Sequence, residues 1–181
     1  MIISVEELRR YITTELEDQV LEARLQALEL LIRGYTNNNF QVRQVRGYGK
    51  VEDGVFTLDK PFRAVVGDTV QMADPDGLHK LLTIKTINSN TFTVNEDTWD
   101  EDGVMVTLIH YPMDVKMGAV NLMKWELEMR GKAGIQSESI SRHSVTYQNM
   151  DTGNARMGFP ASMMGFLKPY MKARFGRGIS V

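Results

Sequence analysis

The sequence predicts an α+β protein, in which a small helical core is interrupted by an inserted antiparallel β-barrel of SH3-like or OB-like size. Apolar residues recur at helical spacing up to Phe40, alternate with polar residues after it, and return to helical spacing from Pro112. The 181 residues, 43% of them hydrophobic and 24% charged, suffice for one globular domain with an insertion. We therefore expect a helical core from residues 1–40 and 112–181, and a β-barrel module from residues 41–111.

The first segment is predicted to form a helical hairpin. Ser4 and Glu7 have the spacing of a capping box, which satisfies free backbone amides at a helix start. Helices are expected over residues 4–16 and 19–35. The second has an apolar stripe with steps of four and three: Leu21, Leu25, Leu28, Ile32 and Tyr35. Residues 37–39 are all asparagine and should end this helix, because asparagine tolerates left-handed backbone angles.

The middle of the chain reads as roughly five short antiparallel strands, the size of a small barrel. Turn residues punctuate it at Asp53-Gly54, residues 74–77 and residues 88–90. The β-rich segments between these turns are Val51 with Val55-Phe56, then residues 69–72, 82–87, 91–94 and 104–109.

A third helix is expected over residues 114–130, capped by Asp114. Residues 131–158 combine many Gly, Ser and Thr with few apolar positions, which predicts a long arm containing a strand. A last helix should begin at Pro160 and reach Phe175.

The last helix is rich in apolar residues and is followed by basic ones. We expect some of the apolar side chains to stay exposed as a docking surface rimmed by positive charge. The apolar positions are Met163, Met164, Phe166, Leu167 and Met171, and the basic ones are Lys168, Lys172, Arg174 and Arg177.

Charge is distributed unevenly along the chain. Residues 1–46, 47–111 and 112–181 carry net charges of −1, −6 and +5, and the middle segment has 5 Lys and Arg against 11 Asp and Glu. Such a pattern suggests that unlike surfaces meet between copies or that the basic end faces a polyanion. The alternative, to which we give equal weight, is that these charged residues lie on solvent-exposed faces and bind no partner.

The sequence does not match the motifs that bind metal ions or phosphate. The chain has no cysteine, which excludes disulfides, thiolate metal sites and thiol catalysis. A calcium loop aligned on Asp102-Gly103 would put Thr98 first and Ile109 at the position of the bidentate glutamate. Gly131-Lys132 lacks the glycine that a phosphate loop needs five residues earlier. We expect no cofactor and no metal.

The three histidines, His79, His110 and His143, lie on separate segments without a second ligand at metal-binding spacing. No constellation of nucleophile, base and orienting group stands out, so no catalytic residue is predicted and the protein is expected to be non-enzymatic. No apolar run reaches the roughly 18 residues of a membrane span, so we expect no membrane partner.

Three stretches of the chain together resemble the head-tail connector proteins of tailed bacteriophages and prophages, also called adaptor or head-completion proteins. The first is the capped helix from Ser4 with the long helix that follows it to Phe40. The second is residues 134–147, which look like the family's arm with its "GI-SE-I" and "SV-Y" patterns. The third is residues 158–170, similar to its proline-started final helix with an "LKPY" end. The β insert departs from the shortest members of that family.

The resemblance implies a ring of identical subunits, a dodecamer when assembled, between the portal protein and a stopper or tail-completion protein. DNA would pass through the ring without sequence-specific reading. The protein would be made in the bacterial host cytoplasm and end at the head-tail interface of the virion. The implied inter-subunit arm contains Ile135, Ser137, Glu138, Ile140, Val145 and Tyr147, and the implied portal-docking helix contains Met163, Met164, Phe166, Leu167, Lys168, Tyr170, Lys172 and Arg174.

A competing interpretation is a small nucleic-acid-binding or protein-binding β-barrel module of a bacterial protein. The net charge of −6 over residues 47–111 argues against nucleic acid, because binding a strand normally requires a basic groove with stacking aromatic residues.

Overall fold

The computed structural model places the chain in two compact units. It describes residues 1–129, 137–140, 143–146 and 155–173. The first unit, the barrel unit, consists of Met1 and Asn39–Tyr111. The second, the helical unit, consists of Ile2–Asn38 and Pro112–Val181. The α+β class predicted from the sequence is confirmed, and so is the antiparallel barrel.

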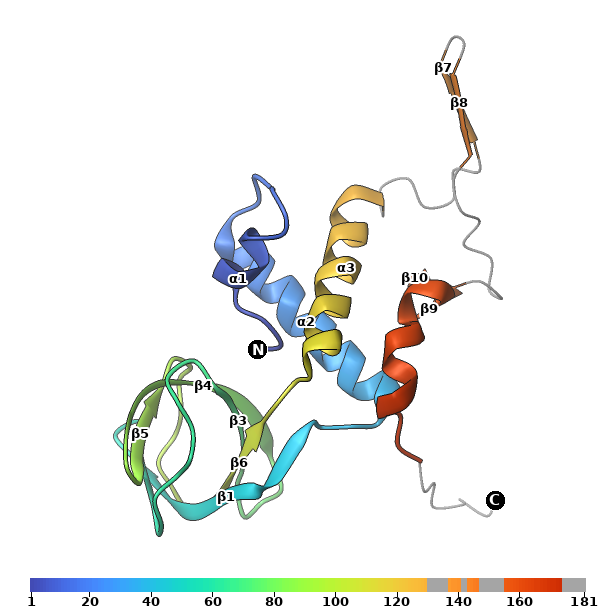
Figure 1. Ribbon diagram of the computed structural model, residues 1–181. Coiled ribbons are helices and arrows are strands. Elements are labelled where there is room, and N and C mark those ends of the chain that lie inside the picture. Colours follow the sequence, from blue (N-terminus) through green and yellow to red (C-terminus); the bar gives the residue numbers. More distant parts are fainter. Residues whose placement is uncertain (130–136, 141–142, 147–154, 174–181) are drawn as a thin grey trace. The chain divides into compact units, whose positions relative to one another are not determined.

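The helical unit contains three α-helices and one 3₁₀ helix within the described residues (Figure 1). They are α1 (Val5–Arg9), α2 (Asp18–Thr36), α3 (Met113–Met129) and η2 (Ala161–Tyr170). Leu21, Leu25 and Ile32 of α2 are fully buried, as the predicted stripe requires. Asn37 ends α2 in the left-handed conformation, with φ of 50°. Arg24 of α2 pairs with Glu126 of α3 at 3.6 Å.

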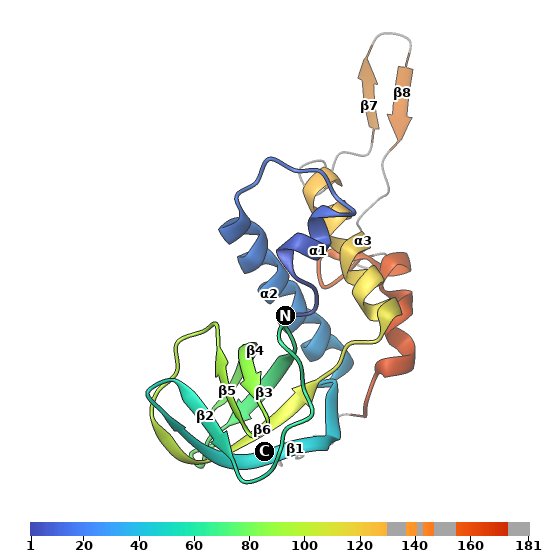
Figure 2. The same ribbon diagram turned by 60° about the vertical axis from the view of Figure 1, so that its left-hand side comes forward.

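The barrel unit is a closed barrel of six strands in the order β1-β2-β5-β4-β3-β6, and every pairing is antiparallel (Figure 2). The strands are β1 (Gln41–Glu52), β2 (Val55–Leu58), β3 (Thr69–Ala73), β4 (His79–Asn88), β5 (Thr91–Val94) and β6 (Glu101–Ile109). The predicted turn at Asp53-Gly54 is confirmed: both residues have positive φ, and Glu52 pairs with Val55 across it.

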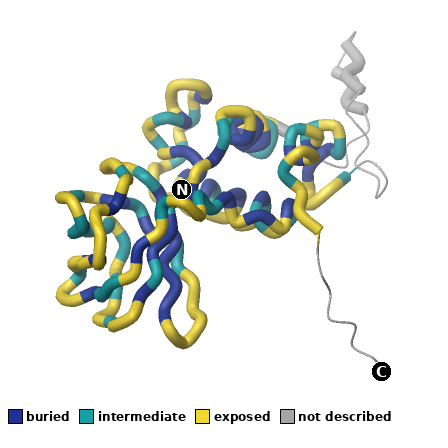
Figure 3. Tube along the Cα trace, turned by 60° about the horizontal axis from the view of Figure 1, so that its bottom comes forward, coloured by how far each residue is buried: buried dark blue, intermediate teal, exposed yellow. Residues whose placement is uncertain are grey.

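The barrel is filled by aromatic and branched side chains that point inward from alternate strand positions. Phe92 stacks on Phe56 with ring centroids 4.6 Å apart and on Phe62 with centroids 5.8 Å apart. The buried strand positions appear dark blue in Figure 3, and the turns that join the strands are largely exposed. The fully buried barrel residues are Val51, Phe56, Leu58, Val70, Met72, Leu82, Ile84, Phe92, Val104 and Val106.

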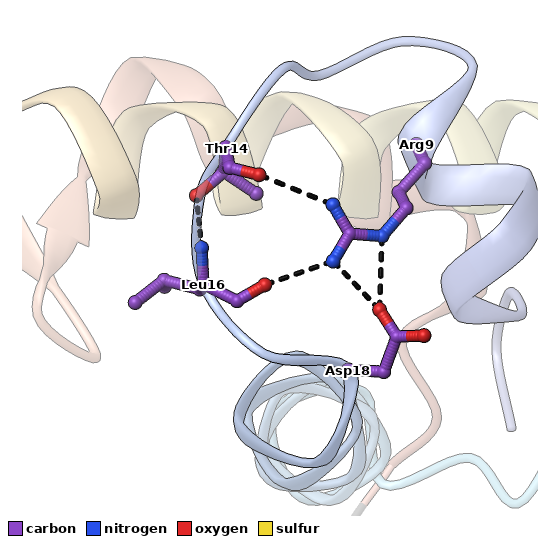
Figure 4. Close-up of polar contacts among 4 residues, drawn as sticks. All are labelled: Arg9, Thr14, Leu16 and Asp18. Atoms are coloured by element: carbon purple, nitrogen blue, oxygen red, sulfur yellow. Dashed lines mark hydrogen bonds and ion pairs between the residues drawn. The ribbon is translucent and has the colours of Figure 1, made fainter.

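The first helix is shorter than predicted: α1 ends at Arg9, whereas the sequence suggested residue 16. The Arg9 guanidinium donates hydrogen bonds to the carbonyls of Thr14 and Leu16 and to the Asp18 carboxylate, 2.6–3.1 Å away (Figure 4). These bonds hold the following residues as a compact turn that leads into α2. The predicted Ser4 cap is confirmed, since its hydroxyl accepts the Glu7 amide at 3.0 Å.

Strand β1 is much longer than the single position Val51 that the sequence suggested, and it makes the sixth strand of the barrel. Its pairing with β6 shifts register between Gln41 and Arg46. This irregularity breaks the strict alternation of apolar residues, since Val42 and Val45 are three positions apart. A period-two pattern is therefore missing from most of the strand.

The last helix also ends earlier than predicted, at Tyr170 rather than Phe175, and it is a 3₁₀ helix. Met171 is extended, the Lys172 amide donates to the Thr36 carbonyl at 2.8 Å, and Asn37 donates to the Ala173 carbonyl at 2.9 Å. The chain after η2 therefore pairs with the end of α2 instead of continuing its own helix.

The described residues of the predicted arm, together with the two residues that follow it, form two short antiparallel strand pairs. Strand β7 (Ser137–Ile140) pairs with β8 (His143–Thr146), and β9 (Ala155–Arg156) pairs with β10 (Phe159–Pro160). In the described part of the chain, no helix combines the length and the apolar character needed to cross a membrane.

Candidate docking surfaces of the helical unit

The predicted docking residues of the 3₁₀ helix η2 differ in burial: some are core residues that anchor η2, and others are half-buried or exposed. Met164 and Leu167 are 1% and 0% exposed and belong to the core of the helical unit. Met163 and Phe166 are half-buried, and the Phe166 ring lies against Gly118 of α3. Because a 3₁₀ helix has three residues per turn, Met164 and Leu167 share one face while Met163 and Phe166 share the next.

Polar contacts tie the end of η2 to α3 and to the residues just after α2. The Tyr170 hydroxyl donates to the Asp114 carboxylate, with both oxygens 2.8 Å away, and the Asn38 amide donates to the Tyr170 carbonyl at 3.1 Å. The hydrogen bond to Asp114 raises the pKa of the Tyr170 phenol above its usual range. Desolvation and the negative charge of Asp114 shift this pKa in the same direction.

The Tyr170–Asp114 contact predicts a stability difference that disappears at alkaline pH. Tyr170→Phe is expected to lower the free energy of unfolding at neutral pH. Since the folded-state pKa lies above the unfolded value of about 10, the contact stabilises the fold below about pH 10 and is lost as the pH rises through the folded pKa. Urea unfolding at several pH values measures this difference.

The exposed Tyr11, changed to Phe in the same way, is the control and should alter stability little at any pH. A Tyr170→Phe effect of constant size from neutral to strongly alkaline pH would contradict the role given to the phenol.

Beyond these anchors, the end of η2 presents a small cationic and apolar surface. Lys168, Met171 and Lys172 are exposed, Met171 to 51%. Arg174 and Arg177, the other predicted basic positions, lie outside the described residues. We call Lys168, Met171 and Lys172 the η2 end surface.

The predicted inter-subunit arm is described only in part. Ser137, Glu138 and Ile140 lie on β7 and Val145 lies on β8, with Glu138 opposite Val145 in the register. Ile135 and Tyr147 lie outside the described residues. An isolated two-stranded hairpin is marginally stable in water, so a third strand from a partner would stabilise it.

An open groove between α3 and η2 was not predicted from the sequence. It has a volume of about 480 Å³, and its apolar lining comes from Trp125, Met163 and Phe166. Trp125 also packs on the buried Phe159, with ring centroids 5.5 Å apart. The sequence signal that could have revealed this groove is the spacing of three between Met163 and Phe166, which indicates a second face of a 3₁₀ helix.

The acidic residues of the barrel are concentrated at one end, where the β1–β2, β3–β4 and β5–β6 connections meet. Several carboxylates there hold turns together. Glu96 accepts from the Thr83 amide and hydroxyl, Asp100 accepts from the Asp53 amide, and Asp74 accepts from the Leu78 amide, all at 2.7–3.0 Å. The stretch tested as a calcium loop and the turn at residues 74–77 thus both have carboxylates that are engaged in backbone hydrogen bonding.

Among the described residues, no three His, Asp or Glu side chains gather closely enough to hold a metal ion. His79 and His110 are exposed on the barrel unit, and the His143 side chain is not among those described.

Comparison with known proteins does not indicate a family for this chain. No protein-family model matches the chain, and no curated protein matches it significantly.

Proposed function

We propose that this chain is a non-enzymatic head-tail connector of a tailed bacteriophage or prophage. In this role, identical copies form a ring, a dodecamer, that binds the portal protein on one side and a stopper or tail-completion protein on the other. DNA passes through the ring without sequence-specific recognition. The site of action is the head-tail interface of the virion.

One observation carries the proposal: two of the three stretches that resemble connectors are hydrogen-bonded to each other. Thr36 and Asn38, at the end of the first stretch, contact Lys172 and Tyr170, at the end of the third and just beyond it. Residues that are about 130 positions apart thus form one structure. This contact supports treating the resemblance as a shared helical unit rather than as unrelated short matches.

The barrel unit fits this role as an insertion with its own core. Residues 39–111 bury their own aromatic cluster, and the chain enters and leaves the barrel through the neighbouring strands β1 and β6. We propose that it is a barrel of the SH3-like or OB-like size class that faces protein. Its acidic end supports protein over nucleic acid as its partner, because phosphates would be repelled there.

We assign portal docking to the η2 end surface, with Met164 and Leu167 as anchors that hold η2 in place. The surface combines an exposed methionine with two lysines, and methionine adapts to irregular partner surfaces.

Reversing charge on the η2 end surface is expected to weaken portal binding. In the Lys168→Glu/Lys172→Glu variant, affinity for the portal of the same phage should fall by about tenfold or more at low salt, and its salt dependence should decrease. The fold should be retained, because both lysine side chains are exposed and the hydrogen bond from Lys172 to Thr36 uses the Lys172 backbone amide. Co-sedimentation with purified portal measures the binding.

Lys60→Glu/Lys85→Glu makes the same charge change on exposed barrel residues and serves as the matched control. Equal affinity of the two variants for the portal would remove the η2 end surface from the proposed interface.

A further inference from the structure

The chain that follows η2 lies along the C-terminal end of α2 as an extended segment. Met171 is the first residue of this segment, with φ of −68° and ψ of 129°. The Lys172 amide donates to the Thr36 carbonyl at 2.8 Å, and the Asn37 side-chain amide donates to the Ala173 carbonyl at 2.9 Å. We call Met171, Lys172 and Ala173 the strap.

The two hydrogen bonds between the strap and α2 use backbone atoms of the strap. The side chains of Met171 and Lys172 are exposed, as is Ala173, and they make no ion pair or hydrogen bond with the part of the chain that the structure describes. Two hydrogen bonds contribute about as much free energy as the ordering of a few residues costs in entropy. A segment with so few buried contacts opens without unfolding of the elements around it.

The groups that hold the strap are available because α2 ends at this point. The Thr36 carbonyl is one of the last four of the helix, which have no partner within the helix itself. Asn37 ends the helix in the left-handed conformation, with φ of 50°. Glycine adopts this conformation at least as readily as asparagine. The end of α2 therefore does not require the Asn37 side-chain amide, which is left to bind the strap.

The residues just before the strap are fixed more firmly. Leu167 is fully buried, and the Tyr170 hydroxyl donates to the Asp114 carboxylate at 2.8 Å. The Asn38 amide donates to the Tyr170 carbonyl at 3.1 Å. Opening of the strap therefore pivots at Met171 and leaves η2 in place.

We propose that Asn37 is the positioning residue of the η2 end surface. Its side-chain amide holds the strap closed and so keeps Met171 and Lys172 in place next to η2, which carries Lys168. Release of the strap frees these two residues from η2 and weakens docking on the portal. The docking step rests on the proposed function, whereas the opening of the strap does not. A partner that binds only the closed state has its affinity reduced in proportion to the fraction of molecules that are closed.

The competing arrangement is a strap that belongs to the cooperative core of the helical unit. Its hydrogen bonds would then open only when α2 unfolds, and Asn37 would contribute to overall stability alone. Hydrogen exchange at the Lys172 amide, measured by NMR on the full chain, distinguishes the two arrangements. Local opening predicts that this amide exchanges much faster than the amides of the buried α2 residues Leu25 and Leu28.

Two substitutions of Asn37 test its role. Asn37→Gly keeps the left-handed helix end and removes the side-chain donor, so the Lys172 amide should exchange up to about fivefold faster, the effect of one hydrogen bond. Asn37→Asp replaces the donor with a carboxylate that repels the Ala173 carbonyl, and it should open the strap further. The free energy of unfolding of Asn37→Gly in urea should not fall, because glycine is favoured at the end of a helix.

Asn39→Gly and Asn39→Asp are the matched controls. Asn39 is exposed, and its side chain makes no hydrogen bond with the residues that the structure describes. These variants make the same chemical changes two positions away and should leave exchange at Lys172 unchanged.

The docking step is measured by co-sedimentation with the portal of the same phage. The closed fraction of each variant follows from its Lys172 exchange rate. Affinity for the portal should fall in the Asn37 variants by the same factor as the closed fraction. Met171 and Lys172 keep their identity in these variants, so the loss reports the position of the surface and not its composition.

Exchange at Lys172 as slow as at Leu25, or equal effects of Asn37→Asp and Asn39→Asp on it, would overturn the inference. Unchanged portal affinity at a reduced closed fraction would overturn the positioning role and leave the connector function intact. A wild-type chain that does not bind the portal would overturn the proposed function and the docking step with it. In that case the exchange rates still decide whether Asn37 holds the strap.

Discussion

Gly49→Ala is expected to destabilise the barrel unit by about 3 kcal/mol or more, the upper end of what overpacking costs. A Cβ atom on Gly49 would lie 2.0 Å from the Thr57 carbonyl oxygen and 2.7 Å from the Leu58 Cα. These are backbone atoms of β2, and Gly49 pairs with Leu58 on one side and with Val104 of β6 on the other. Relief of the clash therefore requires breaking strand pairs that close the barrel.

Each unit contains one of the chain's two tryptophans, which gives a separate signal for the barrel. In a Trp125→Phe background, Trp99 fluorescence during urea unfolding reports on the barrel unit. Gly47→Ala is the matched control: its Cβ would meet the end of the Leu58 side chain, which can move more easily than backbone. If Gly49→Ala lowers the free energy of unfolding of the barrel unit by no more than Gly47→Ala does, the close approach of the β1 and β2 backbones at Gly49 is contradicted.

Gly118→Ala is expected to destabilise the helical unit by about 2 kcal/mol, although alanine is the better helix former. The new Cβ would lie 2.3 Å from the Phe166 ring, so either the ring or η2 must move. A smaller side chain in the double variant Gly118→Ala/Phe166→Leu should recover part of the loss. Trp125 fluorescence in a Trp99→Phe background follows this unit.

The same substitution at Gly34 of α2 is the control, because its Cβ would meet nothing within 4 Å. Gly34→Ala should stabilise the helical unit by up to about 1 kcal/mol. Equal effects of the two substitutions, in either direction, would contradict the packing of Phe166 on Gly118.

The helices, strands and turns that could be predicted correctly are those whose bounds depend on a pattern of residues close together in the sequence. Strand β5 has the predicted bounds, and α2 follows its apolar stripe to within a residue at each end. The turn at Asp53-Gly54 depends only on two residues that tolerate positive φ. In these segments, the residues that determine the structure are neighbours in the sequence.

The elements that were missed depend on distant contacts. The end of α1 is determined by the hydrogen bonds of Arg9 to residues five to nine positions ahead. The end of η2 is determined by pairing with Thr36 and Asn37. The spacing of apolar residues along the sequence does not indicate either the Arg9 hydrogen bonds or the pairing with Thr36 and Asn37.

The same reason limits prediction of the candidate site. The composition of the last helix predicted that apolar side chains would exceed one packed face, but it could not tell anchors from exposed residues. That division follows from the three-residue period of η2, which buries Met164 and Leu167 and leaves Met163 and Phe166 to line a groove. The sequence instead predicted an ordinary helix from Pro160 to Phe175, whereas the 3₁₀ helix observed has ten residues, Ala161–Tyr170.

Electron microscopy of the purified chain mixed with the portal protein of the same phage tests the central proposal most directly. The connector function predicts a ring of copies of this chain, coaxial with the portal and bound to one of its ends, with an open channel through both. Portal particles that carry no added ring, while this chain remains unbound in the same sample, would contradict it.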